Sequence, residues 1–260
     1  MSTDDQTQPR GAQRNRPETV DAFASTVISV LRGRQVVSFD GLRQFVLDHM
    51  MRAVLGHGTY SADRLLAELR GYRLTVDSII DQYVPHVARM LGEQWIRDKI
   101  SFADVTIGSM RLQSLLAEAS SATRTDAGAN APFVHALVLV PQGEQHFLGA
   151  SVVASQIRRM GCDVDMSYDE DMGTLTARLM HCVPDIILIT CARRETLETV
   201  TNTVQIIRNA VSECPVLALG GAIEMKKEDV IKMTGVDIVT NVAEEAVALC
   251  ATRAKPQGAR

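Results

Sequence analysis

A carboxylate, a histidine and a glycine fall within one short segment, at Glu144, His146 and Gly149. The apolar run His135–Val140 before them predicts a buried parallel strand, and the helically spaced apolar residues of 150–160 after them predict a helix. A loop between strand and helix lies at the carboxyl edge of a parallel sheet, where open α/β proteins bind ligands. A neutral imidazole can ligate a metal, and a nearby carboxylate can fix its tautomer. One such histidine alone is more typical of an ordinary surface side chain.

The spacing of these residues adds specificity. Glu144-x-His146-x-x-Gly149 resembles Asp-x-His-x-x-Gly, the signature of cobalamin-binding domains, with Glu in place of Asp. The resemblance implies that His146 is the lower ligand of cobalt, in place of the cofactor's own base, and that Glu144 orients its ring. It also implies that Gly149 leaves a slot beside the first strand for the displaced nucleotide tail.

That family carries two further markers, and both occur here at the ends of predicted strands. The third strand ends at Thr190-Cys-Ala192, where the family has Ser or Thr, and the fourth ends at Gly220-Gly221. The resemblance implies that Ser151 and Thr190 hydrogen-bond the tail and that the glycine pair allows close backbone approach. A strand-end hydroxyl and a turn are the ordinary alternatives. Jointly, the three markers indicate a corrinoid site.

The second half of the chain alternates between short apolar runs and helical patterns. Strands are predicted at 135–140, 163–167, 185–190, 215–219 and 237–240, and helices at 148–160, 172–182, 194–212, 225–233 and 243–252. This alternation predicts an α/β fold with a doubly wound parallel sheet, of which the flavodoxin-like order is one common form.

The first half reads as helical. Helices are predicted from Pro17 to Gly33, up to Gly56, from Leu65 to Leu69, from Val76 to Lys99, and after a capping box at Ser101–Asp104. The predicted organisation is a disordered tail (1–16), a helical bundle (17–122), a linker (123–131), the Rossmann-like domain (132–254) and a loose tail (255–260).

The composition excludes some classes of function. With 46% hydrophobic and 22% charged residues and a net charge of −4, the chain is ordinary for a globular protein and lacks the charge of a broad nucleic-acid-binding face. We expect no signal peptide and no membrane span, hence a cytoplasmic protein. The five scattered cysteines lack zinc-site spacing and are expected to be reduced, buried thiols.

Two local patterns bear on other ligands. Gly143 and Gly149 lack the Gly-x-Gly-x-x-Gly spacing, so NAD is not expected. Arg193-Arg194 follows the third strand and could meet a phosphate or a partner, or simply begin a solvated helix.

The single tryptophan, Trp95, lies on a predicted helix, where a lone Trp is usually part of the core. A helical bundle before a cobalamin domain, however, resembles the cap of methionine synthase and of corrinoid photoreceptors, which shields the upper face of the cofactor. The segment from Trp95 to Thr106 looks like the photoreceptor cap. Val105 and Thr106 stand where those proteins carry Glu-His, so the upper histidine is missing.

Over about residues 75–253 the sequence resembles the PpaA/AerR group of cobalamin-binding regulators of photosynthesis genes. The resemblance implies a light-responsive antirepressor, not an enzyme, that binds adenosylcobalamin or hydroxocobalamin and a PpsR/CrtJ-type repressor. One alternative is a corrinoid methyl carrier of a methyltransferase system. Direct DNA contact is a third reading, which the charge does not favour.

Overall fold

A computed structural model describes residues 41–123, 134–144, 147–221 and 224–253 of the chain. The chain divides into two compact units, residues 1–46 and 47–260. Several predictions fall outside the described residues: the tails at 1–16 and 255–260, the helix from Pro17, nearly all of the linker, and His146. The predicted domain boundaries stay predictions.

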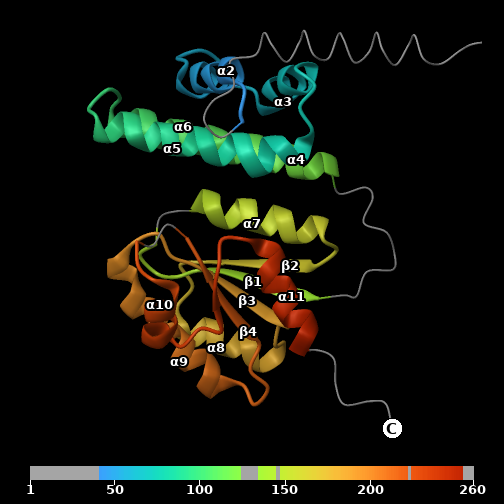
Figure 1. The fold of residues 1–260 in the computed structure, drawn as a ribbon, viewed down its shortest axis with the longest axis vertical. Coiled ribbons are helices and arrows are strands. Elements are labelled where there is room, and N and C mark those ends of the chain that lie inside the picture. The colour runs from blue at the N-terminus through green and yellow to red at the C-terminus, as the bar shows by residue number, and fades with distance from the viewer. Residues whose placement is uncertain (1–40, 124–133, 145–146, 222–223, 254–260) are drawn as a thin grey trace, which may run out of the picture. The chain divides into compact units, whose positions relative to one another are not determined.

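The helical region begins the described part of the chain. With the labels of Figure 1, its helices are α2 Gln44–Leu55, α3 Ala62–Gly71, α4 Val76–Ser78, η1 Ile79–Tyr83, α5 Val84–Ile96 and α6 Phe102–Thr123. α4, η1 and α5 follow one another without a break, and η1 is a π-helical segment that the sequence did not predict. The predicted capping box is present before α6, because the Ser101 N–H donates to Asp104 Oδ2 over 2.9 Å and the Asp104 N–H donates to Ser101 Oγ over 3.1 Å.

Within the second unit, α6 packs closely against α5 and is hydrogen-bonded to the end of α2 by one arginine. A Cβ on Gly108 would lie 2.9 Å from Leu91 Cδ1, so the small residue on α6 lets the Leu91 side chain of α5 pack against it. The Arg111 guanidinium on α6 donates to the backbone carbonyls of Val54 (2.8 Å) and Gly56 (2.6 Å), which ties the end of α2 to α6. These bonds satisfy carbonyls that the end of α2 leaves without helical partners.

The second region is a five-stranded parallel sheet in the order β2-β1-β3-β4-β5, the flavodoxin-like order that the sequence predicts. Its strands are β1 His135–Val140, β2 Asp163–Tyr168, β3 Ile186–Thr190, β4 Val216–Gly220 and β5 Ile238–Val239. The helices are α7 Phe147–Arg159, α8 Met172–His181, η2 Arg194–Thr196, α9 Leu197–Ala210, α10 Lys227–Thr234 and α11 Ala243–Arg253. The fold class is therefore as predicted.

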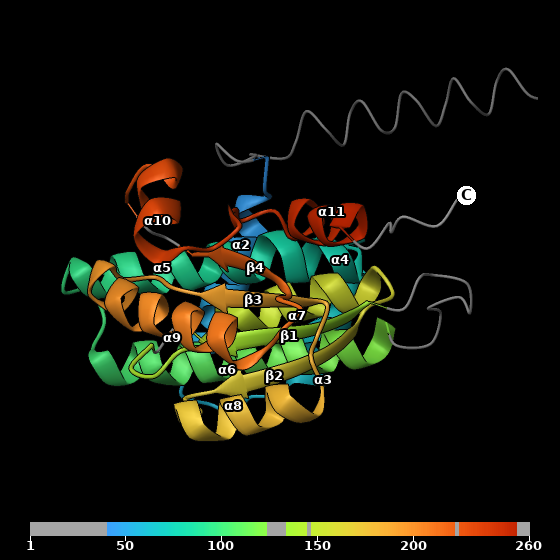
Figure 2. The same ribbon diagram turned by 90° about the horizontal axis from the view of Figure 1, so that it is seen from below.

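Helices cover both faces of the sheet (Figures 1 and 2). One apolar core joins β1, β3 and β4 to α7 and α11, and a second joins the opposite face of the same strands to α8, α9 and α10. Strand β1 is buried along almost its whole length, because alternate residues serve the two cores. This explains why its sequence is a continuous apolar run.

Helix α7 also packs against the helical region, through polar contacts. Arg159 in its last turn donates two 2.6 Å hydrogen bonds to the carboxylate of Asp81 in η1 and lies 3.1 Å from Asp77. Nearer the middle of α7, Ser155 Oγ lies 2.9 Å from Ser120 Oγ of α6. These contacts, on helices that belong to one compact unit, fix α6 and η1 against α7.

Candidate functional site

The predicted strand-end markers come together at the carboxyl edge of the sheet. Leu139 of β1 is paired with Ile189 of β3, and Thr190 is paired with Gly220 of β4, so three strand ends lie side by side. Thr190 Oγ1 lies 3.5 Å from the Leu139 carbonyl, at the limit of a hydrogen bond. The hydroxyl is therefore weakly held by the chain at the place where the sequence predicts a ligand contact.

Glu144 ties the loop after β1 to the loop after β3. Its side chain is almost fully buried, with 2% of the residue exposed. Oε2 accepts the Ala192 backbone N–H at 2.9 Å and faces the Thr196 hydroxyl at 3.4 Å. Between the same two loops, Arg193 Nη2 donates to the Gly143 carbonyl over 2.5 Å. The predicted role of Glu144 in orienting His146 stays a prediction, because His146 lies outside the described residues.

Thr196 and Cys191 also take part in this contact between the two loops, which no local sequence pattern predicted. Cys191 Sγ lies 2.9 Å from Thr196 Oγ1, and both residues are buried. Burial raises the pKa of the Cys191 thiol, an effect that its hydrogen bonds with the Thr196 hydroxyl and the Arg193 backbone carbonyl only partly offset. Cys191 is therefore a neutral, buried thiol, as the composition predicted, and it serves as packing in the loop that Glu144 holds.

The glycine pair is needed by the chain itself. Gly221 has φ +136, and a Cβ there would lie 1.8 Å from the Cys191 carbonyl oxygen. At Gly220, a Cβ would lie 3.0 Å from the Thr240 carbonyl oxygen. Asn241, which the sequence analysis missed, closes the turn by accepting the Gly221 N–H at 2.7 Å and donating to the Gly221 carbonyl over 3.2 Å. Among the described residues, both glycines therefore lie close to the backbone of other loops, which favours the alternative that the pair serves a turn. The predicted contact with a cofactor is not tested by this observation.

Around Gly149 there is room. A Cβ on this residue, in the first turn of α7, would meet nothing within 4 Å. Ser151 Oγ donates back to the Phe147 carbonyl over 3.0 Å and lies 3.5 Å from the Tyr168 hydroxyl. An open hollow of about 320 Å³ lies here, lined by Gln113, Phe147, Ser151 and Tyr168. Of these four residues the sequence predicted only Ser151, because the others come from α6, the start of α7 and the end of β2.

Helix α6 extends beyond the start of α7. Gln113 and Phe147 line one hollow, and Ser120 contacts Ser155, so the two helices run in the same direction. Phe102 lies eleven residues before Gln113 (113 minus 102), about three helical turns or roughly 16 Å along the same face. We call Phe102–Met110 the front half of α6, and residues 111–123 the back half.

The front half of α6 leaves large apolar side chains exposed. Phe102 is 69% exposed and Met110 64%. Trp95, at the end of α5, is 46% exposed, and its ring centroid lies 6.1 Å from that of Phe102. The usual expectation that a lone tryptophan belongs to the core is wrong here. Val105 and Thr106 lie on this front half, and Thr106 Oγ1 donates to the Phe102 carbonyl over 2.9 Å.

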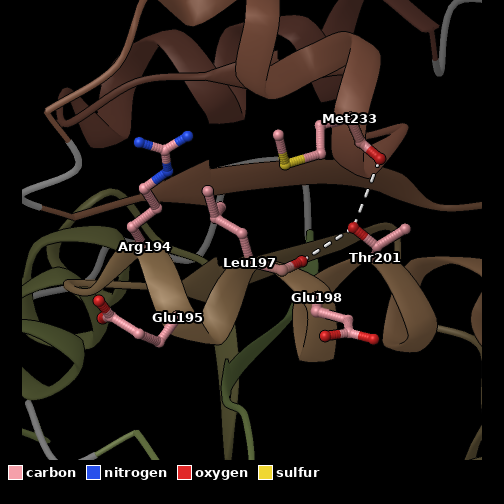
Figure 3. Close-up of a pocket in the computed structure, with 6 residues that line it drawn as sticks. All are labelled: Arg194, Glu195, Leu197, Glu198, Thr201 and Met233. Atoms are coloured by element: carbon pink, nitrogen blue, oxygen red, sulfur yellow. Dashed lines mark hydrogen bonds between the residues drawn. The ribbon is translucent and has the colours of Figure 1, made fainter.

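A second open hollow, of about 410 Å³, lies beside η2 and was not predicted (Figure 3). It is lined by Arg194, Glu195, Leu197, Glu198, Thr201 and Met233. Thr201 Oγ1 donates to the Leu197 carbonyl over 2.8 Å and lies 3.4 Å from that of Met233. Arg194 is the first residue of a short 3-10 helix and lines a hollow that also contains two glutamates. This observation favours the interpretation that Arg193-Arg194 simply begins a helix.

Among the described residues, no group of three or more histidine, cysteine or carboxylate side chains is arranged to hold a metal ion. No helix in the described part of the chain is long and apolar enough to cross a membrane.

Comparison with known proteins gives a relative and a fold. No protein-family profile matches the chain. Over 179 residues it is 33% identical to the "Uncharacterized 20.5 kDa protein in bchF-crtJ intergenic region" of Rhodobacter capsulatus, which covers 69% of this chain and 93% of the relative. The chain belongs to the family of that protein.

Among solved structures, the chain resembles the Methanosarcina barkeri monomethylamine corrinoid protein, with a TM-score of 0.63, 14% identity, and coverage of 81% of this chain and 99% of that one. A cobalamin-binding protein from Desulfitobacterium hafniense covers 80% of this chain and 98% of that one at 14% identity, but with a TM-score of 0.42 it supports no argument. The first likeness shows that the two chains share a fold.

Proposed function

We propose that this protein binds cobalamin at the carboxyl edge of its sheet and acts as a light-responsive regulator of transcription. The observation that carries the proposal is the pairing of two surfaces. The strand-end markers Thr190 and Gly220 are paired at this edge, and Trp95, Phe102 and Met110 expose large apolar side chains at the end of α5 and on the front half of α6. Exposed apolar patches of this kind mark binding sites, and a corrin ring has the broad, largely apolar faces that suit them.

The residues present fit such a group. His146 is proposed as the ligand of cobalt from below. The open space at Gly149 and the hollow between Ser151 and Tyr168 suit the nucleotide tail, with hydroxyl groups from both residues available for hydrogen bonds. Thr190, whose hydroxyl is weakly held by the chain, can turn toward the ligand.

Glu144 restrains the loop that carries His146. Its carboxylate accepts the Ala192 N–H, so it anchors the loop after β1 to the loop after β3. We propose that Glu, one methylene longer than Asp, suits this site because it reaches the loop after β3 from the loop after β1.

The regulatory step is proposed for the front half of α6. Bound adenosylcobalamin would supply a light-sensitive cobalt–carbon bond. Trp95 and Phe102 would then contact a changed upper face, and α6 is held to α7 by the Ser120–Ser155 contact. Such a change alters the surface shown to a partner only as far as these residues contact the two forms differently.

The partner we propose is a PpsR/CrtJ-type repressor, with the protein acting as an antirepressor in the cytoplasm. This rests on the family resemblance and on the relative, whose description places it in a bchF-crtJ intergenic region. We propose no catalysis by this chain and no direct contact with DNA, since the net charge is −4.

A second candidate function is that of a corrinoid methyl carrier. The fold shared with the Methanosarcina barkeri monomethylamine corrinoid protein favours it. In this case the exposed side chains of the front half would admit a methyltransferase and would not respond to light.

The visible spectrum of the purified chain tests the proposal. It is recorded with adenosylcobalamin and with hydroxocobalamin, in darkness and after illumination, for the wild type, His146→Ala and the control His181→Ala. The expected result is a bound corrinoid spectrum that changes with light and depends on His146 alone. Binding with no lasting difference between dark and lit samples would favour the methyl carrier. Absence of binding would refute the site.

A further inference from the structure

A cysteine, a histidine and an aspartate meet at the amino edge of the sheet, the opposite end of the strands from the candidate site. His135 is the first residue of β1, Asp165 lies on the neighbouring β2, and Cys182 caps the end of α8. Cys182 Sγ lies 3.7 Å from His135 Nδ1, within reach of a sulfur hydrogen bond. The other ring nitrogen, Nε2, lies 3.3 Å from Asp165 Oδ2.

This order of groups is suited to thiol activation. With a proton on Nε2, facing the carboxylate, Nδ1 is an acceptor aimed at the thiol. It can take the thiol proton, and the Asp165 carboxylate then stabilises the imidazolium that forms. The thiolate is the nucleophilic form of cysteine, so an acceptor at this distance favours reaction at Cys182.

Cys182 also differs from the other four cysteines in its access to solvent. Cys162, Cys191 and Cys250 are buried, and Cys214 is partly buried. Burial raises the pKa of each of these four thiols, which keeps them protonated. Cys182 is exposed, in the turn between α8 and β3. Cys182 therefore combines exposure to solvent with a neighbouring group, the His135 ring, that can accept the thiol proton.

We propose that Cys182 is a site of reversible thiol modification that forms a mixed disulfide with a low-molecular-weight disulfide such as glutathione disulfide. Cys182 Sγ, as the thiolate, attacks one sulfur of that disulfide, and a new S–S bond forms as the old one breaks. The departing thiolate takes the proton from the His135 imidazolium. Cys182 is oxidised, and one half of the small disulfide is reduced to a free thiol.

This site is independent of the proposed cofactor. His135 begins β1, Asp165 lies on β2 and Cys182 precedes β3, whereas the candidate site lies at the carboxyl ends of β1 and β3. A failure of cobalamin binding would leave the inference at Cys182 untouched, and the reverse also holds.

The test uses the reduced full-length chain with glutathione disulfide. Intact mass spectrometry follows adduct formation, and peptide mapping locates the adduct. One glutathione per chain is expected, on Cys182, removable by a reducing agent and absent in Cys182→Ser. Its rate should exceed that of the same thiol in the chain unfolded by denaturant. Cys214→Ser, which removes the next most accessible thiol, should react at the wild-type rate.

The histidine and the aspartate are tested by their own variants. His135→Gln should slow the reaction about tenfold or more, because the thiol loses the acceptor for its proton, and Asp165→Asn should slow it less. His181→Gln, next to Cys182 in sequence, is the matched control and should have no effect. If His135→Gln fails to fold, Asp165→Asn, at a largely exposed side chain, still decides. Equal rates in the variants that fold, or an adduct that forms equally at other cysteines, would overturn the proposal.

Discussion

The two halves of α6 share one helix but face different surroundings. In the back half, Leu112, Leu115 and Ala119 are fully buried. In the front half, Phe102, Ile107 and Met110 remain 47–69% exposed, although they are just as apolar. Helix α7 begins at Phe147, alongside Gln113, so the front half extends past it. The difference indicates that the back half stabilises the fold, whereas the front half is available to a ligand.

The largest effect expected from this comparison is on stability. Leu115→Ala removes a side chain with no exposed surface and should lower the free energy of unfolding by about 2–5 kcal/mol. Phe102→Ala, at the exposed end of the same helix, should change it by less than about 0.5 kcal/mol. Urea unfolding followed by circular dichroism measures both. Equal losses would show that the front half is packed as tightly as the back half.

The second largest effect is expected at the ion pair between Arg159 of α7 and Asp81 of η1. Arg159→Ala removes a guanidinium that is mostly buried and that bonds the Asp81 carboxylate twice, so we expect a loss of about 2–3 kcal/mol. Arg159→Lys keeps the charge but not the paired geometry and should recover part of it. Arg64→Ala, whose ion pair with Glu68 is largely exposed, serves as control and should lose little. If Arg159→Ala lost no more free energy of unfolding than Arg64→Ala, the Arg159–Asp81 ion pair would not stabilise the packing of α7 against η1.

The third prediction concerns affinity. If the proposed site is correct, Trp95→Ala and Phe102→Ala should each weaken hydroxocobalamin binding by about tenfold, from the apolar contact that each ring loses. Met180→Ala removes an apolar side chain of α8 that is 74% exposed and should leave binding unchanged. Equilibrium titration followed by the visible spectrum separates them. Unchanged affinity for hydroxocobalamin in both aromatic variants would show that the front half of α6 does not contact the cofactor.

The smallest effect is a pH dependence at the beginning of the front half. Hydrogen bonds from the Ser101 hydroxyl and backbone N–H lower the pKa of Asp104. A carboxyl whose pKa is lowered on folding stabilises the helix start above its unfolded value, about 3.9, and loses that contribution as pH falls through the folded value. Amide hydrogen exchange in the first turn of α6 should therefore accelerate on acidification relative to an unfolded reference. Asp104→Asn should remove this dependence, and persistence of it would assign the effect to another group.

Local sequence signals predicted much of this molecule. Alternating apolar runs and helical patterns predicted the parallel sheet, because a fully buried strand must be apolar on both faces, and the observed strand order is the flavodoxin-like one, a common form of such sheets. Ser101 and Asp104 predicted the capping box, since both partners lie within one turn.

Contacts between distant segments could not be predicted in this way. Glu144 reaches Ala192 across 48 residues, and Gly221 packs on Cys191 in a neighbouring loop, so no local pattern reveals either contact. The exposure of Trp95 was also hidden, because an amphipathic helix looks the same whether its apolar side chain meets a core or a ligand. The predicted roles of the site residues, with His146 first, stay predictions.

Anomalous X-ray scattering at the cobalt edge, from crystals grown with hydroxocobalamin, tests the central claim most directly. We predict one cobalt position at the carboxyl edge of the sheet, with a nitrogen of His146 as a ligand and the front half of α6 on the opposite face of the corrin. A cobalt position elsewhere, or one at this edge without a ligand from His146, would contradict the account.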